Sequence, residues 1–291
     1  MLGILVIDKP LGITSHDVVG RVRRKFSTKR VGHAGTLDPL ATGVLVVAVG
    51  PATRFLQYLP LEPKEYVFKV KFGIETTTQD AEGDIVAEKG VPENLLAEIE
   101  RFLPDFRGSI QQIPPMYSAV KKDGKPLYAL AREGETIERD PRNVFIYKYE
   151  IVQSDGDEVT FLCECSGGTY VRTLAHDMGQ NVGCGAHVIE LRRTRVGGFT
   201  IDCATQLEDA TPLDLIQLKD ALTDKQIIAL NWETVTDAWN GNAIGVRPVP
   251  TDPYVALADP AGNVMGMARV TEHGFLQPEC VIPREAFDAP V

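Results

Sequence analysis

The sequence lacks the long apolar runs and leader features that define membrane and secreted proteins. Its longest uninterrupted apolar run, Val44 to Val49, is far shorter than the ~20 residues that a membrane helix needs. The N-terminus carries no basic segment and no small-residue cleavage site, so it indicates a strand rather than a signal peptide. We therefore expect a cytoplasmic protein that does not bind a membrane.

Cysteine is also scarce, with five residues at positions 163, 165, 184, 203 and 280. An odd number in a chain of 291 residues argues against a disulfide framework. Cys163 and Cys165 lie in an alternating stretch, where side chains two apart share one strand face, so we expect both to pack as small hydrophobic residues. No second Cys/His pair has the spacing of a zinc site, and the sequence predicts no metal.

Several catalytic signatures are missing. No HExxH, GxSxG or CxxC motif occurs, which weakens the protease, α/β-hydrolase and thiol-redox interpretations. Walker-type and Rossmann-type glycine spacings are absent as well. Any catalytic activity must therefore use a set of residues outside these familiar motifs.

The net charge of −10 argues against loose nucleic-acid binding, but the charge is unevenly spread. Residues 1–204 hold 25 basic and 27 acidic residues, whereas residues 205–291 hold 5 and 13. Six basic residues and no acid lie between Arg21 and Arg30. Two smaller basic groups are Lys121, Lys122 and Lys125, and Arg192, Arg193 and Arg195. This pattern fits a local basic groove on an acidic protein, and it fits ordinary solvated helix faces equally well.

Hydrophobic periodicity predicts an α+β protein. Strands are expected at residues 2–7, 44–49, 64–72, 143–152, 157–165 and 188–192, and helices at 15–26, 93–103 and 170–182, the first capped by Ser15. Beyond residue 205, short helical patterns at 212–218 and 224–230 precede four small strands at 243–246, 254–258, 264–270 and 280–282. The composition indicates a boundary near residues 232–240, with a small β module after it.

The segment from Val31 to Gly43 is the most unusual loop. Its glycines permit positive φ or close approach to a ligand, and Asp38 precedes a proline that stiffens its backbone. A short carboxylate on such a loop suits nucleophilic attack or acid–base work. The features alone favour the simpler interpretation, an Asp-Pro turn that satisfies local N–H groups.

A second candidate is the segment from Ser166 to Arg172, where a strand ends and a helix begins. Glycines and Thr169 expose backbone N–H groups that suit an anion. Arg172 lies in the first turn, where the helix dipole disfavours a cation, so we expect a carboxylate or phosphate partner. A surface arginine is the alternative. Tyr66 and Tyr170 are, on the same grounds, expected to be buried core tyrosines with satisfied hydroxyls.

The ordered set of motifs resembles the bacterial tRNA pseudouridine-55 synthases, the TruB family. Gly32-His-Ala-Gly-Thr-Leu-Asp-Pro-Leu-Ala-Thr-Gly-Val-Leu45 is similar to the family's catalytic motif. Further matching segments, in order, are Asp8-Lys-Pro with Thr14-Ser15, Lys64-Glu-Tyr66, 73–83, 114–121, 124–134, 166–173 and 183–193. The resemblance covers residues 3–200. It implies a pseudouridine synthase fold, with a central mixed, largely antiparallel sheet flanked by helices at 1–235 and a small β-rich PUA-like RNA-binding module at 236–291.

The family's roles carry over residue by residue. The resemblance implies that Asp38 is the catalytic aspartate, that Arg172 pairs with it, and that Tyr66 stacks against the target uracil. The expected substrate-binding residues, which would line the uridine pocket, contact the opened RNA loop or support the catalytic loop, are Tyr66, Tyr170, Leu191, His33 and Lys9. Candidate contacts to the RNA backbone are Arg21, Arg24, Lys25, Arg192 and Arg193.

Two positions depart from the family pattern. Thr77 stands where relatives often carry an acid, and Gly168 stands where they often carry a lysine. Neither belongs to the catalytic set. The glycine would weaken one phosphate contact.

The implied reaction turns one T-loop uridine of tRNA, at position 55, into pseudouridine. It is an isomerisation, so we expect no cofactor, no metal and no guide RNA, and a monomeric enzyme whose partner is the T-arm of tRNA. Because that uridine is stacked, the enzyme must extrude it. Two alternatives stay open: a catalytically silent tRNA-binding or RNA-folding protein, and a guide-dependent synthase that modifies ribosomal RNA.

Overall fold

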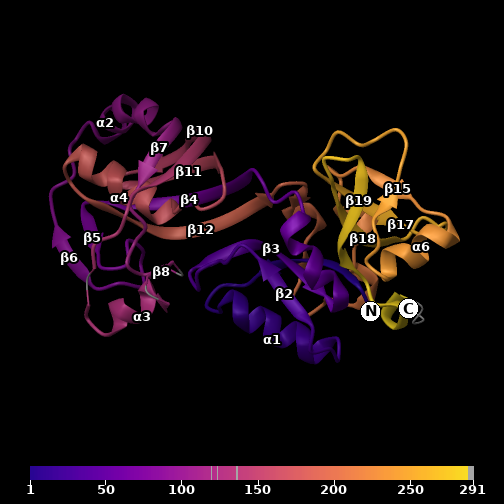
Figure 1. Ribbon diagram of the computed structural model, residues 1–291. Coiled ribbons are helices and arrows are strands. Elements are labelled where there is room, and N and C mark those ends of the chain that lie inside the picture. Colours follow the sequence, from indigo (N-terminus) through magenta and orange to yellow (C-terminus); the bar gives the residue numbers. More distant parts are fainter. Residues whose placement is uncertain (119, 123, 136, 288–291) are drawn as a thin grey trace. The chain divides into compact units, whose positions relative to one another are not determined.

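The structure is a computed structural model that describes residues 1–118, 120–122, 124–135 and 137–287. Two compact units alternate along the sequence, and Figure 1 shows their elements. Unit 1 comprises Met1–Leu37, Val44–Leu61 and the chain from Gly198 onward, whereas unit 2 comprises Asp38–Gly43 and Glu62–Gly197. The side chains of Lys121 and Lys122, in the second basic group, lie outside what the structure describes.

The N-terminal part of unit 1 is built on a buried strand. Its elements are β1 (Gly3–Lys9), α1 (Ser15–Lys25), β2 (Val31–Ala34), the later part of β3 (Ala41–Val49) and the 3-10 helix η1 (Gly50–Tyr58). β2 pairs antiparallel with β3, and β1 pairs in parallel with the short β14 (Thr205–Gln206). The predicted strands at 2–7 and 44–49 are confirmed, because fully apolar runs of this length form buried strands.

Helix α1 forms where its apolar positions predict it, with Val18, Val19 and Val22 buried. Its cap was predicted wrongly, since Thr14 and not Ser15 is the N-cap. Thr14 accepts a hydrogen bond from the Asp17 N–H, and the Asp17 carboxylate accepts one from the Thr14 N–H, which completes a capping box. Ser15 is thereby left for another contact, described below.

A separate five-stranded sheet forms the C-terminal part of unit 1, in the order β15-β17-β18-β19-β16. Its strands are β15 (Ile227–Ala229), β16 (Ile244–Gly245), β17 (Tyr254–Ala258), β18 (Val264–Val270) and β19 (Phe275–Val281). Helix α6 (Trp232–Trp239) packs on β16 and β19, and α7 (Arg284–Phe287) follows. The core of this sheet includes Val235, Leu257, Met265 and Leu276.

Three short helical elements connect the two parts of unit 1: η3 (Ile201–Cys203), η4 (Pro212–Asp214) and α5 (Leu218–Ala221). The helix predicted at 212–218 is thus only a single turn, η4, before α5 begins. The helix predicted at 224–230 is wrong, because Ile227 and Ile228 form the parallel strand β15 beside β17. Pairing with a distant strand overrides the weak local helical pattern at these β-branched residues.

Unit 2 is a mixed sheet in the order β3-β12-β4-β11-β10-β7, in which β3 and β12 are parallel and the other neighbours are antiparallel. Its own strands are β4 (Lys64–Phe72), β7 (Gly108–Gln112), β10 (Arg142–Asp155), β11 (Glu158–Cys165) and β12 (Ala186–Val196). β13 (Phe199–Thr200) follows β12 in the chain. The α+β class and the mixed, largely antiparallel sheet are therefore confirmed.

Helices and small hairpins complete unit 2. They are α2 (Leu95–Phe102), η2 (Leu103–Phe106), α3 (Leu127–Arg132), α4 (Val171–Val182), the hairpin β5 (Ile74–Thr76) with β6 (Ile85–Glu88), and β8 (Lys121–Lys122) with β9 (Lys125–Pro126). Helix α4 packs on β12, and α2 packs on α4 (Figure 1). The rings of Phe68, Tyr149 and Phe161 form an aromatic cluster with centroid distances of 5.1 to 6.0 Å. Cys163 and Cys165 are buried free thiols, as predicted.

Candidate active site

A carboxylate and a guanidinium from distant parts of the sequence meet in unit 2. Oδ2 of Asp38 lies 3.0 Å from Nε of Arg172. The Arg172 side chain is only 5% exposed, whereas that of Asp38 is 38% exposed. The expected anionic partner of the first-turn arginine is therefore Asp38, and the contact favours the ionised form of this carboxylate. The Asp38 carboxylate is thus ionised, held in place and open to solvent, which suits it to react with a substrate.

All three nitrogens of the Arg172 guanidinium have oxygen partners. Nη1 lies 3.1 Å from Oδ2 of Asp80 and donates to the carbonyl of Thr78 at 2.7 Å, and Nη2 donates to the carbonyl of Tyr117 at 2.8 Å. These contacts fix the plane of the guanidinium, and its Nε lies toward Asp38. The arrangement orients the Asp38 carboxylate.

Asp80 is a partner of Arg172 that sequence reasoning missed. Its side chain is 3% exposed and accepts hydrogen bonds from the Thr78 hydroxyl and the Glu82 N–H. Asp80 lies in residues 73–83, one of the segments that resemble the family. The adjacent residues in the sequence do not show whether its carboxylate is buried or exposed. A second missed residue is Gln112, 2% exposed, whose amide pairs with both backbone groups of Tyr170.

The loop that carries Asp38 is anchored on both sides. In unit 1 the Ser15 hydroxyl accepts from the N–H of Leu37 at 2.8 Å and donates to its carbonyl at 3.1 Å. This is the contact for which Ser15 is used instead of capping α1. In unit 2 the chain after Asp38 pairs in parallel with β12, with Ala41 opposite Leu191 and continuing through Gly43.

Gly43 is required by this pairing. Its φ is +98°, and a Cβ atom built there would lie 2.1 Å from the carbonyl oxygen of Arg193. Real Cβ atoms do not approach a backbone oxygen so closely, and L side chains rarely adopt this φ. The glycine therefore lets the chain after Asp38 enter the sheet directly beside β12.

The remaining predicted uridine-binding residues also belong to unit 2. Tyr66 is 7% exposed on β4, and Leu191, 8% exposed, lies on the neighbouring β12 opposite Phe68. Tyr170 is half-buried and is the N-cap residue of α4, two residues before Arg172. The expectation of burial is thus confirmed for Tyr66. Burial raises the pKa of its hydroxyl, and a hydrogen bond from Arg193 opposes that rise.

Lys9 and His33 lie in unit 1. The Lys9 side chain is fully buried, and its ammonium donates to the carbonyls of Pro10 and Ile13. This burial does not fit direct contact with a substrate, and the two hydrogen bonds tie down the turn before α1. The expected support of the Asp38 loop by Lys9 stays a prediction. His33 is half-buried on β2, opposite Val47.

The predicted RNA-backbone residues separate into two groups. Arg21, Arg24 and Lys25 are exposed on α1, where Arg21 pairs with Glu208 at 3.1 Å and Lys25 donates to the Glu208 carbonyl. Arg192 is half-buried and donates to the Thr42 hydroxyl at 3.3 Å. Arg193 is only 1% exposed, which does not fit a contact with RNA phosphates. The prediction for Arg193 is therefore corrected, because strand alternation turns it into the interior.

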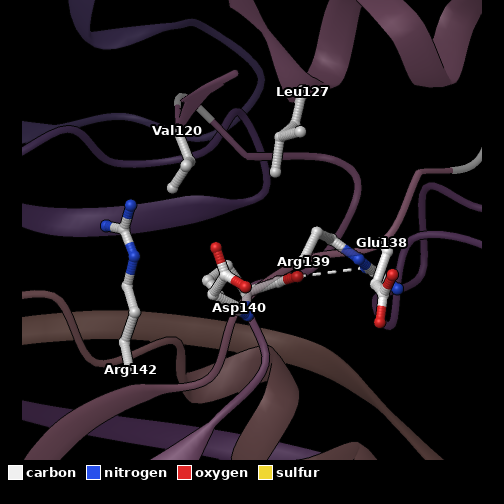
Figure 2. Close-up of a pocket in the computed structure, with 7 residues that line it drawn as sticks. Val120, Leu127, Glu138, Arg139, Asp140 and Arg142 are labelled. Carbon is white, nitrogen blue, oxygen red and sulfur yellow. Dashed lines mark hydrogen bonds between the residues drawn. The ribbon is translucent and has the colours of Figure 1, made fainter. Parts of the chain in front are cut away.

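One small pocket lies elsewhere in unit 2 and contains none of the predicted site residues (Figure 2). Its lining residues are Pro114, Val120, Leu127, Glu138, Arg139, Asp140 and Arg142. Arg139 closes one side by donating to the Pro114 carbonyl at 3.0 Å. Among the described residues, no cluster of His, Cys, Asp or Glu could hold a metal ion. The same part of the chain has no helix with the length and apolarity to cross a membrane.

Family models match most of the chain, and curated relatives match almost all of it. A model of the TruB family pseudouridylate synthase N-terminal domain matches residues 23–171, and one of the tRNA pseudouridylate synthase B C-terminal domain matches residues 172–227. A tRNA pseudouridine synthase B of Pseudomonas fluorescens (strain Pf0-1) is 41% identical over 97% of this chain and 96% of its own. The enzyme of that name from Pseudomonas aeruginosa (strain UCBPP-PA14) is 40% identical over 96% and 95%.

Two solved structures share the fold. A Cbf5-Nop10-Gar1 complex contains a chain that aligns with a TM-score of 0.72 and 27% identity, covering 99% of this chain and 87% of that one. An H/ACA RNP bound to a substrate RNA containing 2'-deoxyuridine aligns with a TM-score of 0.69 and 25% identity, over 97% and 86%. Fold and site thus define a pseudouridine synthase. The chain belongs to the TruB family.

Proposed function

We propose that this protein is an enzyme that isomerises a uridine of tRNA to pseudouridine, and that the target is position 55 in the T loop. The observation that carries the proposal is the exposed Asp38 carboxylate held 3.0 Å from the buried Arg172 in a chain of this family. Curated relatives at 40–41% identity bear the name tRNA pseudouridine synthase B. Nothing favours the guide-dependent alternative, and the chain of the H/ACA RNP is only 25% identical.

The reaction breaks the N1–C1′ bond, turns the uracil, and joins C5 to C1′. Asp38 acts as the ionised carboxylate, by addition to C6, by attack on C1′ or by assisting glycal formation. Arg172 keeps this carboxylate charged and oriented. The C5 proton leaves last. No atom is gained or lost in the isomerisation, so its stoichiometry requires no redox partner and no nucleotide.

Substrate binding is proposed to use residues around Asp38 and the basic surface of α1. Tyr66 stacks against the extruded uracil, with Tyr170 and Leu191 beside it, and His33 contacts the RNA loop that the uridine leaves. Extrusion costs a few kcal/mol of unstacking, which these contacts offset. Arg21, Arg24, Lys25 and Arg192 contact phosphates and supply salt-dependent affinity. Residues 236–291 are proposed as a PUA-like RNA-binding module, and the enzyme as a cytoplasmic monomer.

The test is incubation of the pure protein with an unmodified tRNA transcript, without guide RNA or cofactor. We expect pseudouridine at one T-loop position, mapped by mass-shift labelling. A transcript with cytidine at that position is the control and should gain none. Binding without product would support the silent RNA-binding alternative, and product only with a guide RNA and partner proteins would support the ribosomal one.

A further inference from the structure

A second buried guanidinium lies beside the proposed uracil-stacking residue. Arg193 is 1% exposed and stands directly opposite Tyr66 in the antiparallel pairing of β12 with β4. The nearby Arg193 guanidinium lowers the pKa of the Tyr66 hydroxyl through its charge and through a side-chain hydrogen bond. A buried guanidinium is unfavourable unless other groups bond and pair with it, so the burial of Arg193 beside Tyr66 is a built feature of this site.

The direction of Arg193 follows from the strand that carries it. Leu191 and Arg193 alternate onto the face that also holds Phe68 and Tyr66 of β4. The neighbouring Arg192 contacts Thr42, whereas Arg195 pairs with Glu164 at 3.1 Å. Of the three arginines in this stretch, Arg193 is therefore the one that faces the tyrosine.

Several ionisable groups face the Tyr66 hydroxyl. Arg193 lies on β12, and Cys163 and Cys165 lie on β11. Lys64 lies on β4, the strand of Tyr66, near Arg193 and Cys165. Glu62 is the carboxylate that faces Lys64. Burial raises the pKa of Tyr66, and the Arg193 charge and hydrogen bond act in the opposite direction. Burial and the nearby Arg193 charge also lower the pKa of Lys64.

An arginine can only donate hydrogen bonds, so in this contact the Tyr66 oxygen must be the acceptor. The single phenolic proton is then left for a second acceptor. The same guanidinium stabilises negative charge on the oxygen whenever that proton is given up. The pair thus makes Tyr66 an oriented proton donor or acceptor rather than only a flat stacking surface.

We propose that Arg193 is a positioning residue that orients the Tyr66 hydroxyl toward the bound uridine for proton transfer during isomerisation. The proposal rests on the proposed function, since it assumes that Tyr66 contacts the target base. It replaces the predicted role of Arg193 in binding RNA phosphates. Arg193 itself touches Tyr66 and not the substrate.

The test compares Arg193→Gln with Arg193→Lys in single-turnover reactions at saturating tRNA across a pH series. We expect Arg193→Gln to lower the maximal rate about 100-fold, the usual size of an acid–base contribution, and to move the alkaline part of the profile to higher pH. Arg193→Lys keeps a donor and a charge and should recover part of the rate. The affinity for tRNA and its salt dependence should stay unchanged in both.

A double-mutant cycle with Tyr66→Phe shows whether Arg193 acts through the hydroxyl. In the Tyr66→Phe background, Arg193→Gln should cause no further loss of rate. An equal loss in both backgrounds would overturn the proposal, and so would a weaker tRNA affinity with a shallower salt dependence. If Arg193→Gln does not fold, Arg193→Lys takes its place in the cycle, and a loss of rate of the same size with and without the Tyr66 hydroxyl would overturn the proposal.

The two proposals fail in different ways. An unaltered protein that makes no pseudouridine contradicts the proposed function. An active protein whose rate and pH profile do not change in Arg193→Gln contradicts only the role of Arg193.

Discussion

Replacing Asp38 with asparagine removes the negative charge and leaves the side-chain volume almost unchanged. We expect Asp38→Asn to abolish pseudouridine formation while tRNA binding stays within about twofold, because an amide is neither nucleophilic nor basic. Mass-shift labelling measures product, and filter binding measures affinity. Asp84→Asn, at an exposed acid in the same unit, is the matched control and should keep full activity. Product formed by Asp38→Asn would contradict the catalytic role.

Arg172 neutralises a carboxylate that the fold has buried. We expect Arg172→Met to lower the free energy of unfolding by about 3–5 kcal/mol, because Asp80 then stays buried without its cation. Urea unfolding measures the change. Adding Asp80→Asn should restore part of the loss, since it removes the unpaired charge.

The control for Arg172 is a pair of the same kind at the surface. Arg101 pairs with Glu98 at 3.1 Å, and its side chain is 63% exposed. Arg101→Met should cost less than about 1 kcal/mol. Similar losses for both variants would mean that the Arg172 contacts do not stabilise the fold.

The parallel pairing of β3 with β12 brings the catalytic loop to its place. We expect Gly43→Ala to destabilise the protein by more than the ~1–2 kcal/mol of left-handed strain alone, because its Cβ would meet the Arg193 backbone. Gly168→Ala is the control, with φ +82° and no atom within 4 Å of the built Cβ. Thermal unfolding of the two variants separates the clash from the strain. Equal losses of stability would show that β12 shifts to accommodate the added Cβ.

Helix α1 presents its basic residues on the side opposite its buried valines. We expect Arg24→Ala with Lys25→Ala to weaken tRNA binding and to flatten the plot of log affinity against log salt by about one unit per lost phosphate contact. The control is Lys148→Ala with Lys219→Ala, which removes the same charge at two exposed lysines and should leave the slope unchanged. An unchanged slope in the α1 variant would mean that this helix does not bind RNA.

Within unit 1, η1 and the C-terminal sheet are joined through Tyr58. Its hydroxyl donates to Glu279 at 3.3 Å, and its ring lies 5.5 Å from that of Tyr254. Burial and the nearby Glu279 charge raise the pKa of Tyr58 to about 12. The folded state therefore holds this proton more tightly than the unfolded state, whose tyrosine titrates near ~10.

This contribution to stability is complete below about pH 10 and is lost as the pH rises toward 12. We expect Tyr58→Phe to remove that part of the alkaline decline in stability, measured by denaturation at a series of pH values. Tyr147→Phe, at an exposed tyrosine, should not change it. If both variants behave alike, Tyr58 does not titrate in contact with Glu279.

Much of this molecule could be predicted from local sequence. Strong periodicity located β4, β11, β17, β18 and α4, because residues that must be buried on one face repeat every two or every 3.6 positions. The ordered motifs identified the TruB family and singled out Asp38 and Arg172, whose contact is confirmed. These features depend on neighbours in the chain and on residue identity, both of which a sequence contains.

Other features were decided only when distant segments met. The strand β15 forms because β17 lies beside it. Ser15 does not cap α1, because its hydroxyl is hydrogen-bonded to the Leu37 backbone. Asp80 became a partner of Arg172 through an ion pair between distant segments. Arg193 turned from the expected RNA surface to Tyr66 through strand pairing across more than a hundred residues. Burial and charge pairing arise from such long-range contacts, so only the tertiary structure determines them.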